Sequence, residues 1–321
     1  MLDIEAEVRG AHERIGRLVR RTPIEDSIWL GRTTGCRVSL KLENLQASSS
    51  FKLRGAANKL LSLDENERRR GVVAASTGNH GAAVAHLLDY FGWPGVIYLP
   101  ETAAPAKIGA LEDREVDLVL VGRDGIDAER IARAEAERSG RTFISPYNDV
   151  KVIGGQGTIG LELQSQIECI DTVLIPVGGG GLAAGVGGYL KAIDESIEII
   201  GCQPIASRVM YESIQAGEVL DLESSPTLAD GTAGGLEADT VTLPICQAVI
   251  DDFVLVDEDE ILGAIRQMLT RHHFLIEGAA ALPIAALLQS GRRFEGKNVV
   301  LIITGARLGM DALARVISVE R

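Results

Sequence analysis

The chain has 321 residues, is 46% hydrophobic and carries a formal net charge of −13. This length and apolar content suit a globular protein with one large or two smaller cores. The acidic balance argues against a nucleic-acid partner, because phosphate backbones are bound by clustered lysine and arginine. No apolar run reaches the roughly 18 residues of a membrane helix, so we expect a cytoplasmic protein with no membrane partner.

The earliest element that the pattern defines is a helix whose first turn contains Lys52, directly after "SSSF". A second helix is expected to end at Arg68, Arg69 and Arg70, because cations favour the negative end of a helix dipole and Gly71 follows. The arginine cluster therefore has a structural interpretation. Lys52 alone could be either a solvated charge or a reactive amine.

Further along the chain, short apolar runs rich in valine and isoleucine alternate with helical patterns. Such runs are typical of strands buried on both faces of a parallel sheet, with helices as crossovers. Helices are predicted over residues 125–139 and 181–193. Strands are predicted at residues 71–76, 95–100, 116–122, 171–179, 197–203 and 298–305. The pattern predicts an α/β fold, and its irregular spacing argues against an eight-fold barrel.

A glycine-rich loop, Gly178–Gly181, lies between a predicted strand and a predicted helix. Consecutive glycines and a helix N-terminus favour a phosphate cradle, although a tight packing turn would use the same residues. Gly179, Gly181 and Ala184 also fit the dinucleotide pattern G-x-G-x-x-A. The next strand, however, ends in Gln203 rather than in an acid that could bind ribose.

A second polar loop, "STGNHG", follows the strand at 71–76. It places Ser76, Thr77, Asn79 and His80 at the carboxyl end of that strand, where open α/β sheets bind ligands. Asn79 and His80 could instead be turn and cap residues. A later strand ends in Thr304, within "LIITGARLG".

Together these stretches resemble the pyridoxal-phosphate-dependent fold-type-II family of serine and threonine dehydratases, which also contains serine racemase. The family's "SFKxRGA" is present as Ser50–Ala56, its "SxGNHG" as Ser76–Gly81 and its tetraglycine loop as Gly178–Gly181. Stretches at 154–163, 227–231 and 276–281 extend the resemblance over nearly the whole chain. It implies two open, twisted, mostly parallel sheets. A large domain (residues 1–47 and 148–321) would bind the cofactor, with a small mobile domain (48–147) inserted in it.

The resemblance also implies roles for individual residues around pyridoxal 5'-phosphate. Lys52 would form the Schiff base and act as the base at Cα, and Gly178–Gly181 would hold the phosphate. The remaining cofactor contacts would be Phe51 on the ring, Asn79 on the phenolic oxygen, Thr304 at the pyridine nitrogen, and Glu277. Substrate contacts would be Ser49, Ser76, Thr77, Asn79 and His80, with Thr77 also a candidate acid or base.

Several positions depart from the family. Ser49 stands where relatives commonly carry glycine, and Thr77 stands where serine racemases place a catalytic serine. Gln203 and Val209 occupy positions that hold acidic cation ligands in relatives, so we expect no metal at this place. Biosynthetic threonine dehydratases carry an additional C-terminal regulatory domain, whereas this sequence stops soon after "TGARLG", so we expect no feedback control by isoleucine through such a domain.

The favoured function is therefore a lyase that removes water from a small 3-hydroxy amino acid, giving a 2-oxo acid and ammonia. One alternative is an amino-acid racemase. Another is a dehydratase for a non-standard substrate, such as phenylserine or a hydroxyectoine-derived amino acid. A different class of alternative is a non-catalytic protein that binds a nucleotide or small molecule. A homodimer is expected.

Overall fold

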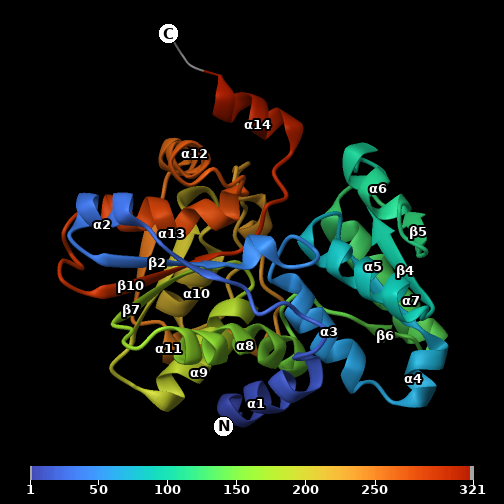
Figure 1. Cartoon of the computed structure of the whole chain (residues 1–321). Coiled ribbons are helices and arrows are strands. Elements are labelled where there is room, and N and C mark those ends of the chain that lie inside the picture. The colour runs from blue at the N-terminus through green and yellow to red at the C-terminus, as the bar shows by residue number, and fades with distance from the viewer. Residues whose placement is uncertain (1, 104, 319–321) are drawn as a thin grey trace.

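The computed structural model describes residues 2–103 and 105–318, in which helices pack on two open sheets (Figure 1). The larger sheet has six strands in the order β1-β2-β10-β7-β8-β9, and the smaller has four in the order β5-β4-β3-β6. Within these sheets β1 pairs antiparallel with β2, while the other paired strands run parallel. The predicted fold class is confirmed.

Each of the six apolar runs contains one strand, but four further strands were not predicted. Three of those four are short or partly exposed, and so lack the continuous apolar run of a buried strand. The strands are β1 (Ile24–Asp26), β2 (Arg37–Leu42), β3 (Val72–Ala75), β4 (Gly95–Leu99), β5 (Asp117–Leu120), β6 (Thr142–Phe143), β7 (Thr172–Pro176), β8 (Glu198–Pro204), β9 (Asp252–Val256) and β10 (Asn298–Ile303).

The two helices predicted over 125–139 and 181–193 have those bounds in the structure, as α7 and α9. The helices are α1 (Ile4–Ile15), α2 (Ile28–Thr34), α3 (Lys52–Ser62), α4 (Glu65–Arg70), α5 (Asn79–Phe91), α6 (Pro105–Glu112), α7 (Gly125–Ser139), α8 (Val150–Gln166), α9 (Gly181–Ile193), α10 (Val209–Ala216), α11 (Thr242–Val249), α12 (Glu258–Gln267), α13 (Gly278–Gln289) and α14 (Met310–Ile317). A short π-helix, Met268–His272, continues α12. As predicted, α4 ends at Arg70, before Gly71.

Helices cover both faces of each sheet. On the larger sheet, side chains of α2, α12 and α13 pack on one face and those of α1, α8, α9 and α11 on the other. Successive residues of β7 alternate between the two cores: Leu174 belongs to the first, and Val173 and Ile175 to the second. On the smaller sheet, α3, α5 and α6 pack opposite α7. Apolar residues on both faces explain the continuous apolar runs.

A buried ion network joins α3 to the larger sheet. The guanidinium of Arg54, fully buried, binds both oxygens of Glu43 at 2.8 Å and Glu162 Oε1 at 2.7 Å. Lys41 Nζ of β2 lies 2.5 Å from Glu162 Oε2. The two carboxylates and two cations neutralise each other in the protein interior, where an unpaired charge would be costly. The second half of the "SFKLRG" motif therefore anchors the helix that begins with Lys52.

The four-stranded sheet lies within residues 72–143, inside the segment predicted to form the small domain. Helix α3 packs against both α5 and α8, and so touches elements on either side of the predicted boundary. The boundaries at 47/48 and 147/148 stay a prediction. None of the helices in the described ranges combines the length and the apolar character needed to cross a membrane.

Candidate active site

Lys52 is the first residue of α3, as predicted. Its side chain is half-buried, and Nζ donates a hydrogen bond of 2.7 Å to the carbonyl oxygen of Pro146. Burial lowers the pKa of the amine to about 8, although the nearby Glu277 carboxyl opposes this shift. Lys52 is therefore not a solvated surface charge. It is an amine that is partly neutral near physiological pH, as a nucleophile or base requires.

The loop before α3 meets the end of β10. The Phe51 N–H donates to the carbonyl of Thr304 at 3.0 Å, and Ser50 forms an isolated antiparallel bridge with Gly305. Thr304 is 1% exposed, and its Oγ1 has no hydrogen-bond partner among the described residues. Two motifs that are about 250 residues apart in the chain are thus adjacent in space. Ser50 Oγ is likewise buried and without a partner among the described residues, so two hydroxyls there are free to bind ligand atoms.

Ser49, the departure from the family's glycine, has a φ of +63°, in the left-handed region. Its N–H donates to the Gln46 carbonyl at 2.7 Å, and its own carbonyl accepts from Ala306 at 3.0 Å. Glycine adopts this conformation without a steric penalty, whereas serine is strained in it. The backbone at residue 49 therefore has the conformation that a glycine would favour. The serine adds a hydroxymethyl group next to the start of α3.

The glycine loop connects β7 to α9. Gly180 has a φ of +84°, which favours glycine, and precedes the first turn of α9. A Cβ on Gly178 would lie 3.0 Å from the backbone of Thr232, and one on Gly179 would lie 2.4 Å from the ring of Tyr147. The loop therefore has no room for side chains. Its backbone N–H groups at the α9 N-terminus form the kind of cradle that binds a phosphate.

Tyr147 covers this loop, and the sequence did not predict it. Its ring packs on Gly179, and its backbone and Cβ lie over Gly181. Its neighbour Pro146 accepts the hydrogen bond from Lys52. One short segment between β6 and α8 therefore contacts both the glycine loop and the lysine. No repeat or motif distinguishes an aromatic residue in such a connection, so only the folded chain identifies it.

Asn79 lies at the start of α5 and faces Glu277 across the site. Its Nδ2 lies 2.8 Å from each carboxylate oxygen of Glu277, and its Oδ1 has no partner among the described residues. Burial raises the pKa of Glu277 to about 7, partly offset by the bond from Asn79, while Asp230 adds to the increase. The Arg307 N–H also donates to this carboxylate, at 3.2 Å. The two predicted residues therefore form one hydrogen-bonded pair.

The other polar residues of the "STGNHG" loop have different surroundings. Ser76 Oγ accepts from the Gly78 N–H at 3.1 Å. His80 is buried, and its Nε2 lies 2.8 Å from the carbonyl oxygen of Ile144. Burial, together with the charge of Lys52, lowers the pKa of His80 to about 3, so its ring is neutral and donates to that carbonyl. No side chain caps α5, so the interpretation of Asn79 and His80 as cap residues is wrong. Thr77 is half-buried in the same loop.

The positions that hold cation ligands in relatives have other partners here. Gln203 Oε1 accepts from the Tyr211 N–H at 2.8 Å, and Val209 is buried at the start of α10. Among residues 2–103 and 105–318 there is no group of three or more histidine, cysteine, aspartate or glutamate side chains that could hold a metal ion. The expected lack of a metal at this place stays a prediction.

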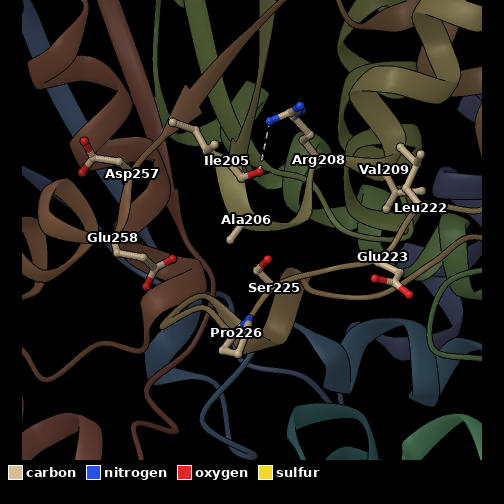
Figure 2. A pocket seen from close by; sticks show the side chains of 10 residues that line it. All are labelled: Ile205, Ala206, Arg208, Val209, Leu222, Glu223, Ser225, Pro226, Asp257 and Glu258. Atoms are coloured by element: carbon tan, nitrogen blue, oxygen red, sulfur yellow. Dashed lines mark hydrogen bonds between the residues drawn. The ribbon is translucent and has the colours of Figure 1, made fainter.

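A pocket of about 630 Å³ lies elsewhere, at the carboxyl ends of β8 and β9 (Figure 2). It is lined by residues that include Ile205, Arg208, Pro226 and Glu258. Arg208 Nη1 lies 3.5 Å from the carbonyl oxygen of Ile205, the contact drawn in Figure 2. The predicted site residues do not line this pocket.

The residues around Lys52 fit a phosphate-bearing aldehyde cofactor. The glycine cradle is closed to side chains, the Lys52 amine has a lowered pKa, and the buried Thr304 hydroxyl and Asn79 carbonyl oxygen lack partners within residues 2–103 and 105–318. These groups offer a phosphate site, a nucleophile for an aldehyde, and hydrogen-bonding partners for ring atoms.

Comparison with known proteins agrees with this fit. The pattern of a family described as "Pyridoxal-phosphate dependent enzyme" matches residues 15–305. An L-threonine ammonia-lyase from Thermotoga maritima is 37% identical over 318 residues, which cover 99% of this chain and 79% of that protein. A catabolic L-threonine dehydratase from Staphylococcus aureus is 36% identical over 97% of this chain and 91% of its own length.

Solved structures give the same result. A maize serine racemase superposes with a TM-score of 0.91 at 31% identity, covering 97% of this chain and 95% of its own. A processed threonine deaminase from Solanum lycopersicum superposes with a TM-score of 0.92 at 34% identity, covering 98% of this chain and 86% of its own.

Proposed function

The chain belongs to the family of pyridoxal-phosphate dependent enzymes, and from this premise we propose that it is a lyase acting on a small 3-hydroxy amino acid. Threonine and serine are the substrates that we favour, and the products are a 2-oxo acid and ammonia. The observation that carries the proposal is the hydrogen bond from the Lys52 amine to the carbonyl oxygen of Pro146. The next residue, Tyr147, covers the glycine loop, so the amine and the loop lie close together. Relatives named threonine ammonia-lyase and threonine dehydratase support the substrate class.

Lys52 is the residue that would hold the cofactor and then take the proton from Cα of the substrate. Bound pyridoxal phosphate supplies an electron sink that acidifies this Cα–H bond. Burial gives the Lys52 amine a pKa of about 8, so a useful fraction is neutral and able to accept a proton near neutral pH. The hydrogen bond to Pro146 fixes the amine in one position.

The surrounding residues would orient the reacting groups. Gly178–Gly181 would hold the phosphate through backbone N–H groups, and Phe51 would contact the ring. Thr304 offers a neutral hydroxyl and Asn79 a free carbonyl oxygen. The buried Glu277 carboxyl, with a pKa of about 7, can carry a proton close to this site.

The "STGNHG" loop would bind the substrate carboxylate. Ser49, Ser76 and Thr77 would contribute hydroxyl groups, and Asn79 its backbone N–H, because its side-chain Nδ2 bonds Glu277. His80 would fix the position of the loop rather than bind the carboxylate through its ring, because the ring is buried and its Nε2 bonds the carbonyl of Ile144. A threonine at 77 carries a methyl group beside its hydroxyl. This crowds the face from which a racemase would return a proton, and so favours elimination.

The experiment is the Lys52→Ala variant, assayed for 2-oxo acid release from threonine and serine. We expect the visible absorption of the bound cofactor and the turnover to be lost together, because one amine serves both purposes. Lys59→Ala, on the same helix but paired with Asp149 at 2.6 Å, is the matched control and should keep both. Turnover in the Lys52 variant would contradict the proposal.

A racemase is the second candidate, favoured by the likeness to the maize serine racemase. Incubation with enantiopure L-serine separates the two reactions, since D-serine and pyruvate can be measured in one sample. Pyruvate forming faster than D-serine is the expected result. A screen that adds phenylserine and 3-hydroxyaspartate would identify a non-standard substrate.

We also propose a homodimer in the cytoplasm. Large apolar side chains remain on the surface of the single chain, including Ile28, which is 69% exposed, and Met310, which is 74% exposed. Where such side chains gather in one patch, they commonly mark an interface with a partner. The four cysteines are free thiols and Cys169 is exposed, which suits a reducing compartment. Fractionation of the source cells would test the location.

A further inference from the structure

Glu237 joins elements of the two sheets at the edge of the glycine loop. It lies in the segment 233–241 that precedes α11, and α11 packs on α9, the helix that the glycine loop begins. Its Oε1 lies 2.8 Å from Nη2 of Arg133 on α7, which packs on the four-stranded sheet. Figure 1 shows α7 beside β4 and β6, and α11 beside α9 on the other side of the molecule. One carboxylate therefore connects the two halves.

The same residue also fixes the segment that covers the glycine loop. The Glu237 N–H donates to the hydroxyl of Tyr147 at 2.9 Å, and Oε2 accepts from Nδ2 of Asn148 at 2.9 Å. Asn148 in turn accepts from the Val241 N–H at 2.9 Å. The ring of Tyr147 is thereby held against Gly179 at both ends, by its own backbone and by its hydroxyl group.

The loop beneath is tied to the same segment. Thr242 Oγ1 donates to the carbonyl of Gly179 at 2.7 Å, and Thr240 bonds Thr242 at 2.8 Å. The Thr240 N–H donates to the Glu237 carbonyl at 3.0 Å. A displacement of Glu237 would therefore affect the glycine loop in two ways. It would move Tyr147, which packs on Gly179, and it would move Thr242, which bonds the Gly179 carbonyl.

We propose that Glu237 is a positioning residue that controls the release of the cofactor phosphate from Gly178–Gly181. The inference rests on the proposed function, because it takes this loop as the phosphate site. The ion pair with Arg133 and the bond to Asn148 keep Tyr147 over the loop, and a phosphate leaves only when Tyr147 moves. The Glu237 side chain is 22% exposed and that of Arg133 is 36% exposed, so the pair is sheltered but accessible to salt.

Arg133 supplies a matched control on its own helix. Its Nη2 also lies 2.8 Å from Glu129 Oε1, one turn earlier in α7. Glu129→Gln therefore removes a carboxylate from the same guanidinium without breaking the link between the sheets. Glu237→Gln removes the charge that forms the link while keeping nearly the same shape.

The test is the rate at which the reconstituted holoenzyme loses pyridoxal phosphate. It is followed as the loss of visible absorbance from the protein during dialysis into cofactor-free buffer. We expect Glu237→Gln to release cofactor about fivefold faster than the wild type, the effect of one partly exposed ion pair. Glu129→Gln should match the wild type. Wild-type release should accelerate with added salt, whereas the Glu237→Gln rate should change less.

A charge swap tests the ion pair itself. In the Glu129→Gln background, which avoids two carboxylates one turn apart on α7, Glu237→Arg combined with Arg133→Glu should bring the release rate back toward that of Glu129→Gln alone. A general loss of stability would not do this. If Glu237→Gln does not fold, Arg133→Gln breaks the same pair from the exposed side. Equal release rates for the wild type and Glu237→Gln would overturn the proposal, as would equal acceleration by Glu129→Gln.

Hydrogen–deuterium exchange of the cofactor-free chain keeps this test separate from the proposed function. Glu237→Gln should accelerate exchange in residues 145–149 and 233–241, and leave α1 and α13 unchanged. If the wild type binds no pyridoxal phosphate at all, the proposed function fails. The exchange measurement still shows whether Glu237 orders the Tyr147 segment through Arg133 and Asn148. Unchanged exchange in both segments would overturn the role of Glu237.

Discussion

At the scale of single residues, the site combines Lys52 and Glu277, and burial brings the pKa values of these two groups closer together. The pKa of Lys52 falls to about 8 and that of Glu277 rises to about 7, because each charged form loses hydration. Both groups can therefore exchange protons near neutral pH. The motif "SFKLRG" indicated the lysine, but the charge state follows from its neighbours. These neighbours, such as Pro146 and Glu277, come from distant parts of the chain, so no local sequence pattern could predict their effect on Lys52.

The shift at Glu277 predicts how stability depends on pH. Its pKa in the folded protein lies near 7, above its ordinary value of 4.5, so between these values the folded chain holds a proton that the unfolded chain has lost. The resulting stabilisation is complete below pH 4.5 and is lost as pH rises toward 7. For the cofactor-free wild type, relative to Glu277→Gln, we expect a loss of up to roughly 3 kcal/mol over this range.

Urea unfolding of both proteins at a series of pH values measures this difference directly. Subtracting the Glu277→Gln curve removes most contributions of other groups, although Asp230, Arg307 and Lys52 act on the same carboxyl. Parallel curves for the two proteins would show that Glu277 does not titrate differently in the folded state.

At the scale of elements, long and strongly patterned segments could be predicted from the sequence, whereas short ones could not. Helices α7 and α9 have the predicted bounds. Helix α7 has buried alanines at a spacing of four and a capping aspartate, whereas α9 is apolar along nearly its whole length and directly follows the glycine loop. Strand β6 has two residues and β9 is mostly half-exposed, so neither shows a continuous apolar run. The glycine loop was identified as a candidate cradle. Its cover, Tyr147, depends on how the chain folds back from β6.

The fit between Tyr147 and the loop predicts the effect of one added methyl group. In Gly179→Ala the new Cβ would come within 2.4 Å of the tyrosine ring, so either the ring or the loop must move. We expect cofactor affinity to fall at least about tenfold, as judged from the pocket distortion that overpacking causes. Fluorescence titration of the cofactor-free protein with pyridoxal phosphate measures this.

The control for that variant is Gly263→Ala. This glycine lies within α12, where an added Cβ meets nothing within 4 Å. Alanine stabilises a helix interior by about 1 kcal/mol relative to glycine, so the variant should unfold at slightly higher urea and bind cofactor normally. Wild-type affinity in Gly179→Ala would mean that the loop tolerates a side chain and is not a close-fitting cradle.

At the scale of the whole molecule, the sequence motifs predicted which residues gather at one place. Lys52, Thr304, Asn79 and Glu277 meet although they lie on four separate segments. Asn79 follows β3 of the smaller sheet and Thr304 follows β10 of the larger one, while Lys52 and Glu277 lie at the starts of α3 and α13. The fold class followed from the same strand patterns. The link through Glu237 could not be predicted, because segment 233–241 has no regular structure and its partners lie on another helix.

The exposed apolar side chains predict the assembly. Helix α14 lies at the edge of the molecule in Figure 1 and packs on α12. Val316 packs inward, while Met310 and Ile317 are 74% and 62% exposed. We expect light scattering to give twice the chain mass of 34.2 kDa, because a second copy would cover such side chains. Met310→Glu should shift the equilibrium toward single chains. A wild-type mass of one chain at micromolar concentration would refute the dimer.

The buried guanidinium of Arg54 also has a consequence for the order in which the protein folds. Its partners lie 11 and 108 positions away in the chain, so the charge is compensated only after segments from distant regions have met. Until then, desolvating the helix that begins with Lys52 is unfavourable. We therefore expect the Lys52 amine to reach its final surroundings late in folding. A nascent or partly folded chain would present no assembled site, and cofactor uptake would report completion of the native state.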